Sequence, residues 1–394
     1  MNLLILGGAG MMGSGTVRDL ISPLSNGVTA VHIADTSLER VERLVETLGD
    51  ERLHAHVLDV ADVTALRALI HGKDLCINAV PTLAGHQMTI FDACFEEGVA
   101  YLDYGGLGVY TVKQKAEHAR WRDAGLTAIL GCGADPGMSN MICKAVAEEF
   151  ETIERINLYW AAAVDGPQNP VLVPPYAVSS LLAEYAMPSQ QFLDGELQEV
   201  PPLSGQETIE LPDPWGATSF IHSIHSEPLT VPFAEGIAEK GIREFTWKLS
   251  LPKEEHDTWA ALMRVGFRDF DEPLEVNGTA VQPGEFLRLL IERNMHKYAG
   301  EIPEQQGHEI HFADGVGTVK GEEKTIRYAI TSGPDPLYDD YIDAGTSMNV
   351  SIAAQLVLGS ARKPGVWGPE EYFAVDPYFA ELEKRHFNII RPSD

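Results

Sequence analysis

A glycine-rich loop near the N-terminus limits the possible folds more than any other part of this sequence. Asn2–Leu6 is a short apolar run, typical of a strand that is buried on both faces. The residues at 8–13, GAGMMG, have the spacing G-x-G-x-x-G, and a helical segment follows them. A second apolar run, 28–34, ends in Asp35. A strand, a glycine loop, a helix, a second strand and an acid in this order indicate a dinucleotide-binding βαβ unit.

Each part of this unit has a physical role in holding a dinucleotide. Gly8 permits the tight turn out of the strand, Gly10 lets the backbone approach a pyrophosphate, and Gly13 lets helix and strand pack closely. The pyrophosphate then faces the free N–H groups and the positive end of the helix. Asp35 would accept hydrogen bonds from the ribose hydroxyls and repel a 2′-phosphate, although Arg40 offers a counter-charge. We therefore expect NAD as the cofactor, with NADP possible.

Composition narrows the class of protein further. The formal net charge of −29, from 29 Lys and Arg against 58 Asp and Glu, argues against nucleic acid as a partner. No apolar run is long enough to cross a bilayer and the N-terminus has no basic leader, so we expect a cytoplasmic protein without a membrane partner. The four cysteines have no C-x-x-C spacing, which favours reduced thiols over disulfides or a zinc site, and we expect no metal.

Up to about residue 130, strand-like and helix-like segments alternate. A third strand ends at Asp59, which either lies beside the adenine or caps the next helix, and a fourth strand ends at Asn78. The carboxyl ends of parallel strands meet at one edge of a sheet, where the cofactor would lie. The expected cofactor-binding residues are Gly8, Gly10, Met11, Met12, Gly13, Asp35, Asp59, Val60, Asn78, Ala79 and Val80.

After Glu149 the pattern changes to strand-like runs separated by loops, which indicates an antiparallel or mixed sheet. The fold class expected is α/β: a doubly wound Rossmann sheet followed by an α+β domain, with a late amphipathic helix over 347–358. We expect a dinucleotide-binding domain over 1–125, an α+β substrate and oligomerisation domain over 126–343, and a return helix and tail over 344–394.

Several motifs beyond the glycine loop resemble those of one family, the saccharopine dehydrogenase-like oxidoreductases. The motifs are LDYGG at 102–106, GCGADPGM at 131–138, HSEP at 225–228, KGIRE at 240–244, and VNG at 276–278 leading to Pro283. The resemblance runs nearly end to end and is nearest to the lysine 6-dehydrogenase branch. It implies that the chain returns to the first domain near its end and that the second domain binds substrate. It also implies that the protein is a homo-oligomer, and specifically a homodimer.

The resemblance also implies a reaction: hydride transfer between nicotinamide and a carbon that bears an amine, through an imine. In the lysine 6-dehydrogenase branch this is oxidative deamination of an amino acid's side-chain amine. In the saccharopine and carboxynorspermidine branches it is reductive condensation of an aldehyde with an amino acid. Asp135 resembles the saccharopine reductases and Lys240–Arg243 the lysine 6-dehydrogenases, so both reactions stay open. A catalytically silent NAD-binding regulator is the alternative from another class of protein.

The candidate catalytic residues are Asp103, at the end of the fifth strand, and His225 in the HSEP motif. Asp103 has the chemistry of a general base for an amine proton, or it only shapes an Asx turn. His225 contacts the pocket or is a packed histidine.

The candidate substrate-binding residues follow from the same motifs. Asp135 either caps the next helix or faces the substrate. A cation from the KGIRE motif either binds the substrate's α-carboxylate or makes a surface ion pair. The expected substrate-binding set is Tyr104, Asp135, Tyr176, Lys240, Arg243 and Thr346.

Overall fold

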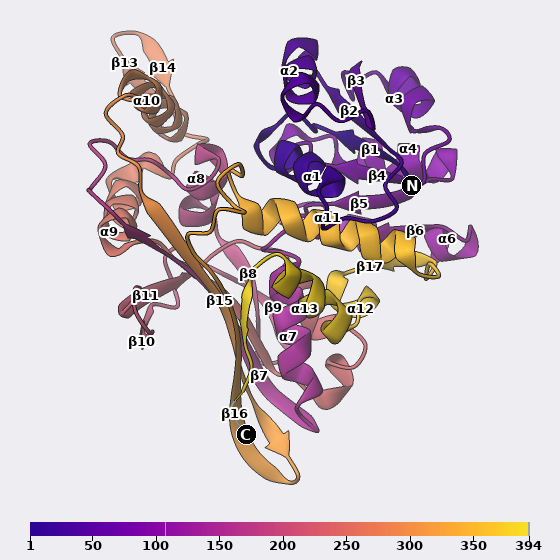
Figure 1. Cartoon of the computed structure of the whole chain (residues 1–394). Coiled ribbons are helices and arrows are strands. Elements are labelled where there is room, and N and C mark those ends of the chain that lie inside the picture. Colours follow the sequence, from indigo (N-terminus) through magenta and orange to yellow (C-terminus); the bar gives the residue numbers. More distant parts are fainter. Residues whose placement is uncertain (107, 393–394) are drawn as a thin grey trace.

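The computed structural model describes residues 1–106 and 108–392 (Figure 1). Its first sheet has seven parallel strands in the order β17-β6-β5-β4-β1-β2-β3. The strands are β1 (Asn2–Leu6), β2 (Ala30–Asp35), β3 (Leu53–Val57), β4 (Leu75–Asn78), β5 (Ala100–Asp103), β6 (Thr127–Ile129) and β17 (Gly365–Trp367). The helices between them are α1 (Met11–Ile21), α2 (Leu38–Leu48), α3 (Val63–Ile70), α4 (Gln87–Glu97), α5 (Thr111–Ala116) and α6 (His118–Asp123). This is the doubly wound sheet that the alternating pattern predicted.

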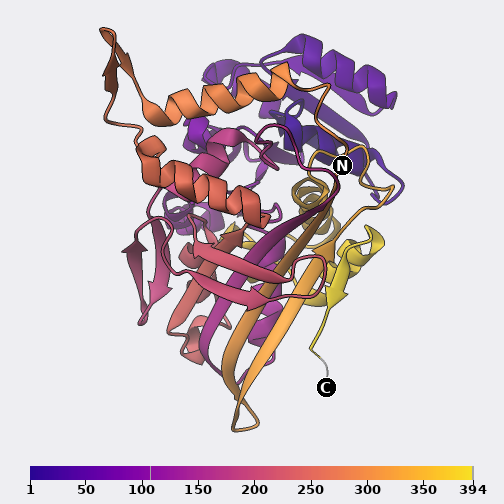
Figure 2. The ribbon, with the colours of Figure 1, turned by 90° about the vertical axis from the view of Figure 1, so that its left-hand side faces the viewer.

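The second sheet is mixed and has nine strands among the described residues. Its main path is β10-β11-β12-β7-β15-β16-β18, with β8 on β12 and β9 on β8; β12 and β7 are parallel and the other pairs antiparallel. The strands are β7 (Thr152–Asp165), β8 (Ser189–Leu193), β9 (Glu196–Val200), β10 (Glu207–Glu210), β11 (Ala217–His222), β12 (Glu244–Ser250), β15 (Gln306–Val319), β16 (Glu322–Ser332) and β18 (Asn388–Ile390). The hairpin β13 (Leu274–Val276) and β14 (Thr279–Val281) stands away from the body of the molecule in Figure 2.

The helices of the second half are α7 (Met138–Glu148), α8 (Val178–Ala186), α9 (Lys253–Leu262), α10 (Pro283–Lys297), α11 (Ala344–Gly359), α12 (Pro369–Tyr372) and α13 (Val375–Lys384). The sequence pattern did not indicate α9 and α10. None of the helices among the described residues is both long and apolar enough to cross a bilayer.

The two sheets do not divide the chain at residue 125. The first sheet includes β6, and it takes a further strand, β17, from the C-terminal tail. Another tail strand, β18, extends the second sheet beside β16. The tail thus contributes one strand to each sheet, and neither sheet is formed by one continuous stretch of the chain. The expected domain limits at 125 and 343 stay a prediction.

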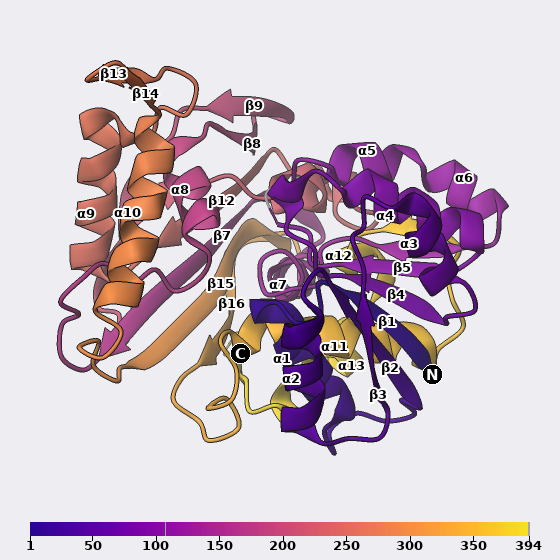
Figure 3. The same cartoon turned by 90° about the horizontal axis from the view of Figure 1, so that it is seen from above.

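The return of the chain to the first sheet is confirmed by α11, which lies against α1 (Figures 1 and 3). The Ser347 hydroxyl donates to the Met12 carbonyl at 3.0 Å, and the Thr16 hydroxyl donates to the Ser347 carbonyl at 2.8 Å. A Cβ at Gly15 would lie 2.4 Å from Ser347 Oγ, so a side chain there would separate the two helices. This contact places the first turn of α11 beside the glycine loop.

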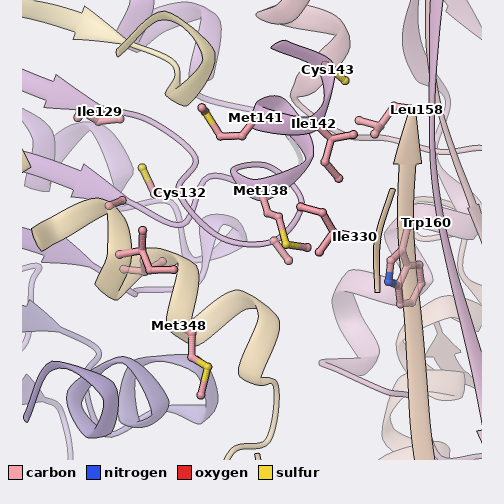
Figure 4. Packing of buried hydrophobic residues seen from close by; sticks show 14 of the residues in the cluster. Ile129, Cys132, Met138, Met141, Ile142, Cys143, Leu158, Trp160, Ile330 and Met348 are labelled. Atoms are coloured by element: carbon pink, nitrogen blue, oxygen red, sulfur yellow. The ribbon is translucent and has the colours of Figure 1, made fainter. Parts of the chain in front are cut away.

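The buried helix α7 packs between the two sheets. Figure 4 shows its residues Met138, Met141 and Ile142 between Met348 of α11 and Leu158 of β7, and all five side chains are buried in one cluster. Because protein cores are closely packed, this helix fixes the distance between the sheets.

A buried ion pair ties the tail to the first domain. Arg385 Nε and Nη2 donate to the Asp19 carboxylate at 3.0 and 2.8 Å, and both side chains are fully buried. Replacing Arg385 with Met leaves the Asp19 charge buried without a partner, so we expect the free energy of unfolding to fall by about 3–5 kcal/mol. The double variant D19N/R385M should recover part of this loss. Urea unfolding measures both variants.

The exposed pair of Arg391 and Glu383 provides the control, because its ion pair spans 2.9 Å in solvent. R391M should change the free energy of unfolding by less than about 1 kcal/mol. Equal losses in R385M and R391M would contradict a structural role for the buried pair.

Candidate active site

A cavity of about 730 Å³ lies between the two sheets. On one side it is lined by the carboxyl ends of β1, β2 and β4, and on the other by β7, β12, β15, α8 and the start of α11. This is the edge of a parallel sheet at which ligands bind in such folds. Arg40 is the one Lys or Arg among the described residues that line the cavity.

The part of the cavity beside the first sheet has the form of a dinucleotide site. Gly10 precedes the first turn of α1, so free N–H groups of that turn are available to an anion. A Cβ at Gly13 would lie 2.6 Å from the Gly7 carbonyl oxygen, which leaves room for glycine alone. The expected cofactor residues that line the cavity are Gly10, Met11, Met12, Gly13, Asp35, Asp59, Val60, Asn78, Ala79 and Val80.

Gly8 is the one expected cofactor residue outside this lining. A Cβ there would lie 2.9 Å from Ile33 Cγ2, so Gly8 lets the turn pack closely against β2.

Asp59 lines the cavity and accepts a hydrogen bond from the Ala61 N–H, whereas Asp62 caps α3. The capping alternative for Asp59 is thus wrong. The part of the cavity beside the first sheet fits a nicotinamide dinucleotide, and its residues would hold the pyrophosphate and the ribose.

At the tip of β2, Asp35 and Arg40 form an ion pair with Arg40 Nη2 at 2.6 Å from Asp35 Oδ1. Asp35 is buried, whereas the Arg40 side chain is about half exposed. Both line the cavity, so a carboxylate and a guanidinium are available at the position where the adenosine ribose lies.

Beyond the glycine loop the cavity becomes acidic. A first group of titratable side chains comprises Asp135, Glu309, His311 and Asp343. His311 Nε2 lies 2.5 Å from Asp135 Oδ2, and Asp343 accepts a hydrogen bond from the Thr346 N–H at 2.7 Å. Burial raises the pKa of Glu309 to about 7, with a further contribution from the charge of Asp343. Burial likewise raises the pKa of Asp343.

The helix-capping role considered for Asp135 is wrong, because Gly137 precedes the first turn of α7. Asp135 instead contacts a strand of the second sheet through His311. For that imidazole, burial acts to lower the pKa, but the neighbouring Asp135, Glu309 and Asp343 outweigh burial and raise it.

A second acidic group surrounds His225. Its Nδ1 lies 3.2 Å from Glu227 Oε2, its Nε2 lies 3.7 Å from Glu184 Oε1, and its ring stacks on Trp247 at 3.7 Å. Burial alone would lower the pKa of His225, but the two carboxylates raise it to about 10. Tyr176 donates to Glu184, and burial raises the pKa of Tyr176 far above its usual value. His225 is therefore a fixed imidazolium rather than a group that exchanges protons near neutral pH.

Aromatic rings connect the two acidic groups. The ring of Trp160 lies 6.0 Å from that of Tyr176 and 6.4 Å from that of His311. Carboxyl groups beside aromatic faces form a favourable environment for an ammonium group.

The structure does not bring Asp103 to the cavity, and this corrects the expected catalytic role. Asp103 is buried, and its carboxylate accepts hydrogen bonds from the backbone N–H groups of Gly105 and Gly131 and from the side chains of Tyr101 and Gln114. Burial raises its pKa. With both oxygens occupied, it shapes the loop after β5.

Lys240 and Arg243 also lie away from the cavity. Lys240 Nζ donates to the Ala147 carbonyl at 2.7 Å, and Arg243 Nη2 donates to the Asp194 carbonyl at 2.9 Å. Neither lines the cavity, so the structure gives no support to the expected binding of a substrate carboxylate by these cations. The other expected substrate residues do line it: Tyr104, Asp135, Tyr176 and Thr346.

The sequence analysis missed part of the acidic lining. Glu309 and His311 alternate on β15 and so share a face, which was a usable signal for a half-buried strand. Asp343 caps α11, and Glu184 lies on α8 after the Pro-rich loop. These residues come from three separate elements, β15, α8 and the start of α11, so their sequence positions did not place them together.

Comparisons with known proteins agree with this architecture. Residues 3–129 match the model of the saccharopine dehydrogenase NADP binding domain. Carboxyaminopropylagmatine dehydrogenase of Synechocystis sp. is 25% identical, over 97% of this chain and 95% of that protein. Carboxynorspermidine synthase of Vibrio alginolyticus is 26% identical, over 66% of each chain.

A solved structure, apo saccharopine dehydrogenase (L-Glu forming) from Saccharomyces cerevisiae, shares the fold. Its TM-score is 0.72 at 15% identity, with 99% of both chains covered. These relatives do not support the lysine 6-dehydrogenase branch in particular. The match over residues 3–129 and the full-length relative make this chain similar to the saccharopine dehydrogenase-like oxidoreductases, and the solved structure shares its fold.

Proposed function

We propose that this protein is an NAD(P)-dependent oxidoreductase that joins an aldehyde to the terminal amine of a polyamine-type substrate, or cleaves the product in reverse. One observation carries the proposal. The substrate part of the cavity holds the four carboxyl groups of Asp135, Glu184, Glu309 and Asp343 against the imidazoles of His225 and His311, with no Lys or Arg among its described lining residues. Such a site favours a ligand with more positive than negative charge.

Charge distinguishes this reaction from deamination of a simple amino acid. An amino acid such as lysine brings an α-carboxylate, and that group lacks a Lys or Arg partner among the described lining residues. A polyamine chain brings two or more ammonium groups, which the two acidic groups and the rings of Trp160 and Tyr176 complement. The names of the relatives describe carboxylated derivatives of agmatine and norspermidine, which is consistent with this charge.

The residues of the chain would divide the work between the two parts of the cavity. A bound nicotinamide supplies a hydride acceptor or donor at its C4 atom. The glycine loop and Asp35 hold the dinucleotide, while Asn78, Tyr104 and Thr346 lie at the junction with the substrate part. The buried rings of Trp160 and Trp247 form an apolar part of the lining, and such surroundings strengthen the attraction between carboxylates and a substrate cation.

The test is a spectrophotometric assay of NADH and NADPH oxidation with an amino-acid semialdehyde and a series of amines. We expect turnover with 1,3-diaminopropane or agmatine, and at least tenfold lower kcat/KM with n-propylamine, which has a single charge. Oxidation of lysine with NAD⁺ at a higher kcat/KM than any of these condensations would contradict the proposal.

Carboxyl groups of the cavity should control the KM for the amine. E184Q and E309Q each remove one negative charge, so we expect the KM for the diamine to rise about tenfold, equivalent to about 1.4 kcal/mol. The kcat should change less than the KM, because this attraction is present before and during hydride transfer. E196Q, on the exposed part of β9, is the matched control and should leave both constants unchanged.

The pH dependence follows from Glu309, whose pKa of about 7 lies above its usual value because of burial. This side chain is neutral below pH 6 and charged above pH 8, so the KM for a diamine should fall across that interval. E309Q should remove this component of the pH profile. A wild-type KM that rises between pH 6 and 8 would show that a different group governs binding.

Cofactor preference should depend on the ion pair of Asp35 and Arg40. We propose NAD as the preferred cofactor, because the Asp35 carboxylate repels a 2′-phosphate. D35A frees Arg40 to bind that phosphate, so the ratio of kcat/KM for NADP to that for NAD should rise at least tenfold. R40A should lower the same ratio. Tighter binding of NADP than NAD by the wild-type protein would refute the preference.

A further inference from the structure

One oxygen of Asp135 has no partner although it is buried. Its Oδ2 lies 2.5 Å from His311 Nε2, but Oδ1 makes no hydrogen bond with any part of the chain that the structure describes. A buried carboxylate oxygen without a hydrogen-bond donor lowers the stability of the folded protein, so such an atom in a native structure often has a functional reason. Asp135 lines the cavity, so a bound molecule can donate to this atom once the side chain turns its covered oxygen toward the cavity.

The position of Asp135 relates this oxygen to the cofactor site. The loop that carries it lies against the first turn of α11, where a Cβ at Gly133 would be 3.2 Å from Thr346 Cγ2. Tyr104, Ala134 and Thr346 line the cavity beside it. Asp135 therefore lies between the glycine-loop part and the substrate part of the cavity, which is where the proposed reaction needs a proton acceptor.

Groups from several elements face the pair formed by Asp135 and His311. Glu309 comes from β15, Asp343 from the turn before α11, and Tyr176 from the loop before α8, and each of them interacts electrostatically with Asp135 or His311. The buried thiol of Cys143 on α7 is close enough for the charge of Asp135 to raise its pKa further, after burial. Within this set, His311 is the one basic group.

We propose that Asp135 and His311 form the proton-transfer pair of this enzyme, with Asp135 Oδ1 bound to the reacting nitrogen of the substrate. The inference rests on the proposed function and adds to it the residues that handle the proton. Asp135 is the group that contacts the nitrogen. His311 is the base that holds the proton on Nε2, beside Asp135 Oδ2.

The step balances in the direction of oxidation. A secondary ammonium, R–CH₂–NH₂⁺–R′, gives one N–H proton to the neutral imidazole of His311 through Asp135, which frees the nitrogen lone pair. The C–H bond then breaks with loss of hydride to the nicotinamide cofactor, and a C=N bond forms as R–CH=NH⁺–R′. In the condensation direction the imidazolium returns the proton to the nitrogen as the hydride arrives at carbon.

The other imidazole of the cavity is unsuited to this task. His225 lies between Glu184 and Glu227 and stacks on Trp247, and Ser139 Oγ donates to the second oxygen of Glu227 at 2.8 Å. Its two carboxylate neighbours hold its proton, whereas His311 has a carboxylate neighbour with one oxygen free for the substrate. The structure thus assigns different roles to two histidines in one cavity.

A binding experiment without cofactor tests the pair directly. A cationic amine beside His311 should expel the imidazolium proton, so binding of 1,3-diaminopropane near pH 7 should release protons to the buffer. Calorimetric titration in phosphate and in Tris measures the number released. H311Q should bind the diamine but release fewer protons, because the Gln amide still donates to Asp135 but does not titrate. E309Q separates the contribution of Glu309, which also ionises in this range.

Kinetics give the second measurement. H311Q and D135N should lower kcat about 10²-fold or more and remove one limb of its pH profile, while the affinity for the dinucleotide, measured by fluorescence, stays the same. H308Q is the matched control, because His308 lies on the same strand and also pairs with an aspartate, Asp165 at 3.0 Å, but outside the cavity. It should retain wild-type kcat and proton release.

The outcomes separate this inference from the proposed function. Wild-type turnover with diamines, together with unchanged proton release and an unchanged kcat profile in H311Q, would overturn the proton-transfer pair alone. No binding and no turnover of amines by the wild-type protein would overturn the proposed function, and the pair with it. If H311Q does not fold, D135N decides by the same two measurements.

Discussion

The contact between α11 and α1 is the constraint on which the cavity depends. Ser347 donates to the Met12 carbonyl and accepts a hydrogen bond from the Thr16 hydroxyl, and Gly15 leaves the space that this approach requires. The first turn of α11, with Asp343 and Thr346, consequently lies beside the glycine loop. The chain between the two helices includes most strands of the second sheet, so this contact joins the nucleotide part of the cavity to the substrate part.

Charge is distributed in a way that suits this geometry. The chain carries 29 Lys and Arg against 58 Asp and Glu, and the two cations that the sequence suggested for the site bond to backbone carbonyls instead. Lys240 and Arg243 each donate to a carbonyl, and Arg385 neutralises Asp19 in the core. The acidic groups of the cavity are therefore left to their two histidines and to a ligand. In a partly buried cavity, carboxylates that two histidines neutralise only in part attract a cation more strongly than surface carboxylates do.

The sequence predicted the parts of the structure that depend on local pattern. The glycine spacing, the apolar runs and Asp35 identified the first sheet and the nucleotide cradle, because each of these features acts within about 35 residues. The return of α11 was predicted from resemblance and not from a local signal. The acidic lining was largely missed, because Asp135 and His311 are 176 positions apart and meet only through the pairing of β7 with β15 and the packing of α7 beneath them.

Asp103 shows why a residue type at a strand end is insufficient to identify a catalytic group. Its position at the carboxyl edge of β5 and its raised pKa are features of a general base, but four donors occupy its two oxygens. Asp135, 32 positions later, has the opposite arrangement: one oxygen is held by His311 and the other is buried and unpaired. A carboxylate whose hydrogen bonds are complete stabilises a loop, whereas one with a vacant, buried acceptor is ready for a ligand. The number of unfilled acceptors distinguishes the two aspartates, and that number depends on tertiary contacts that no single sequence displays.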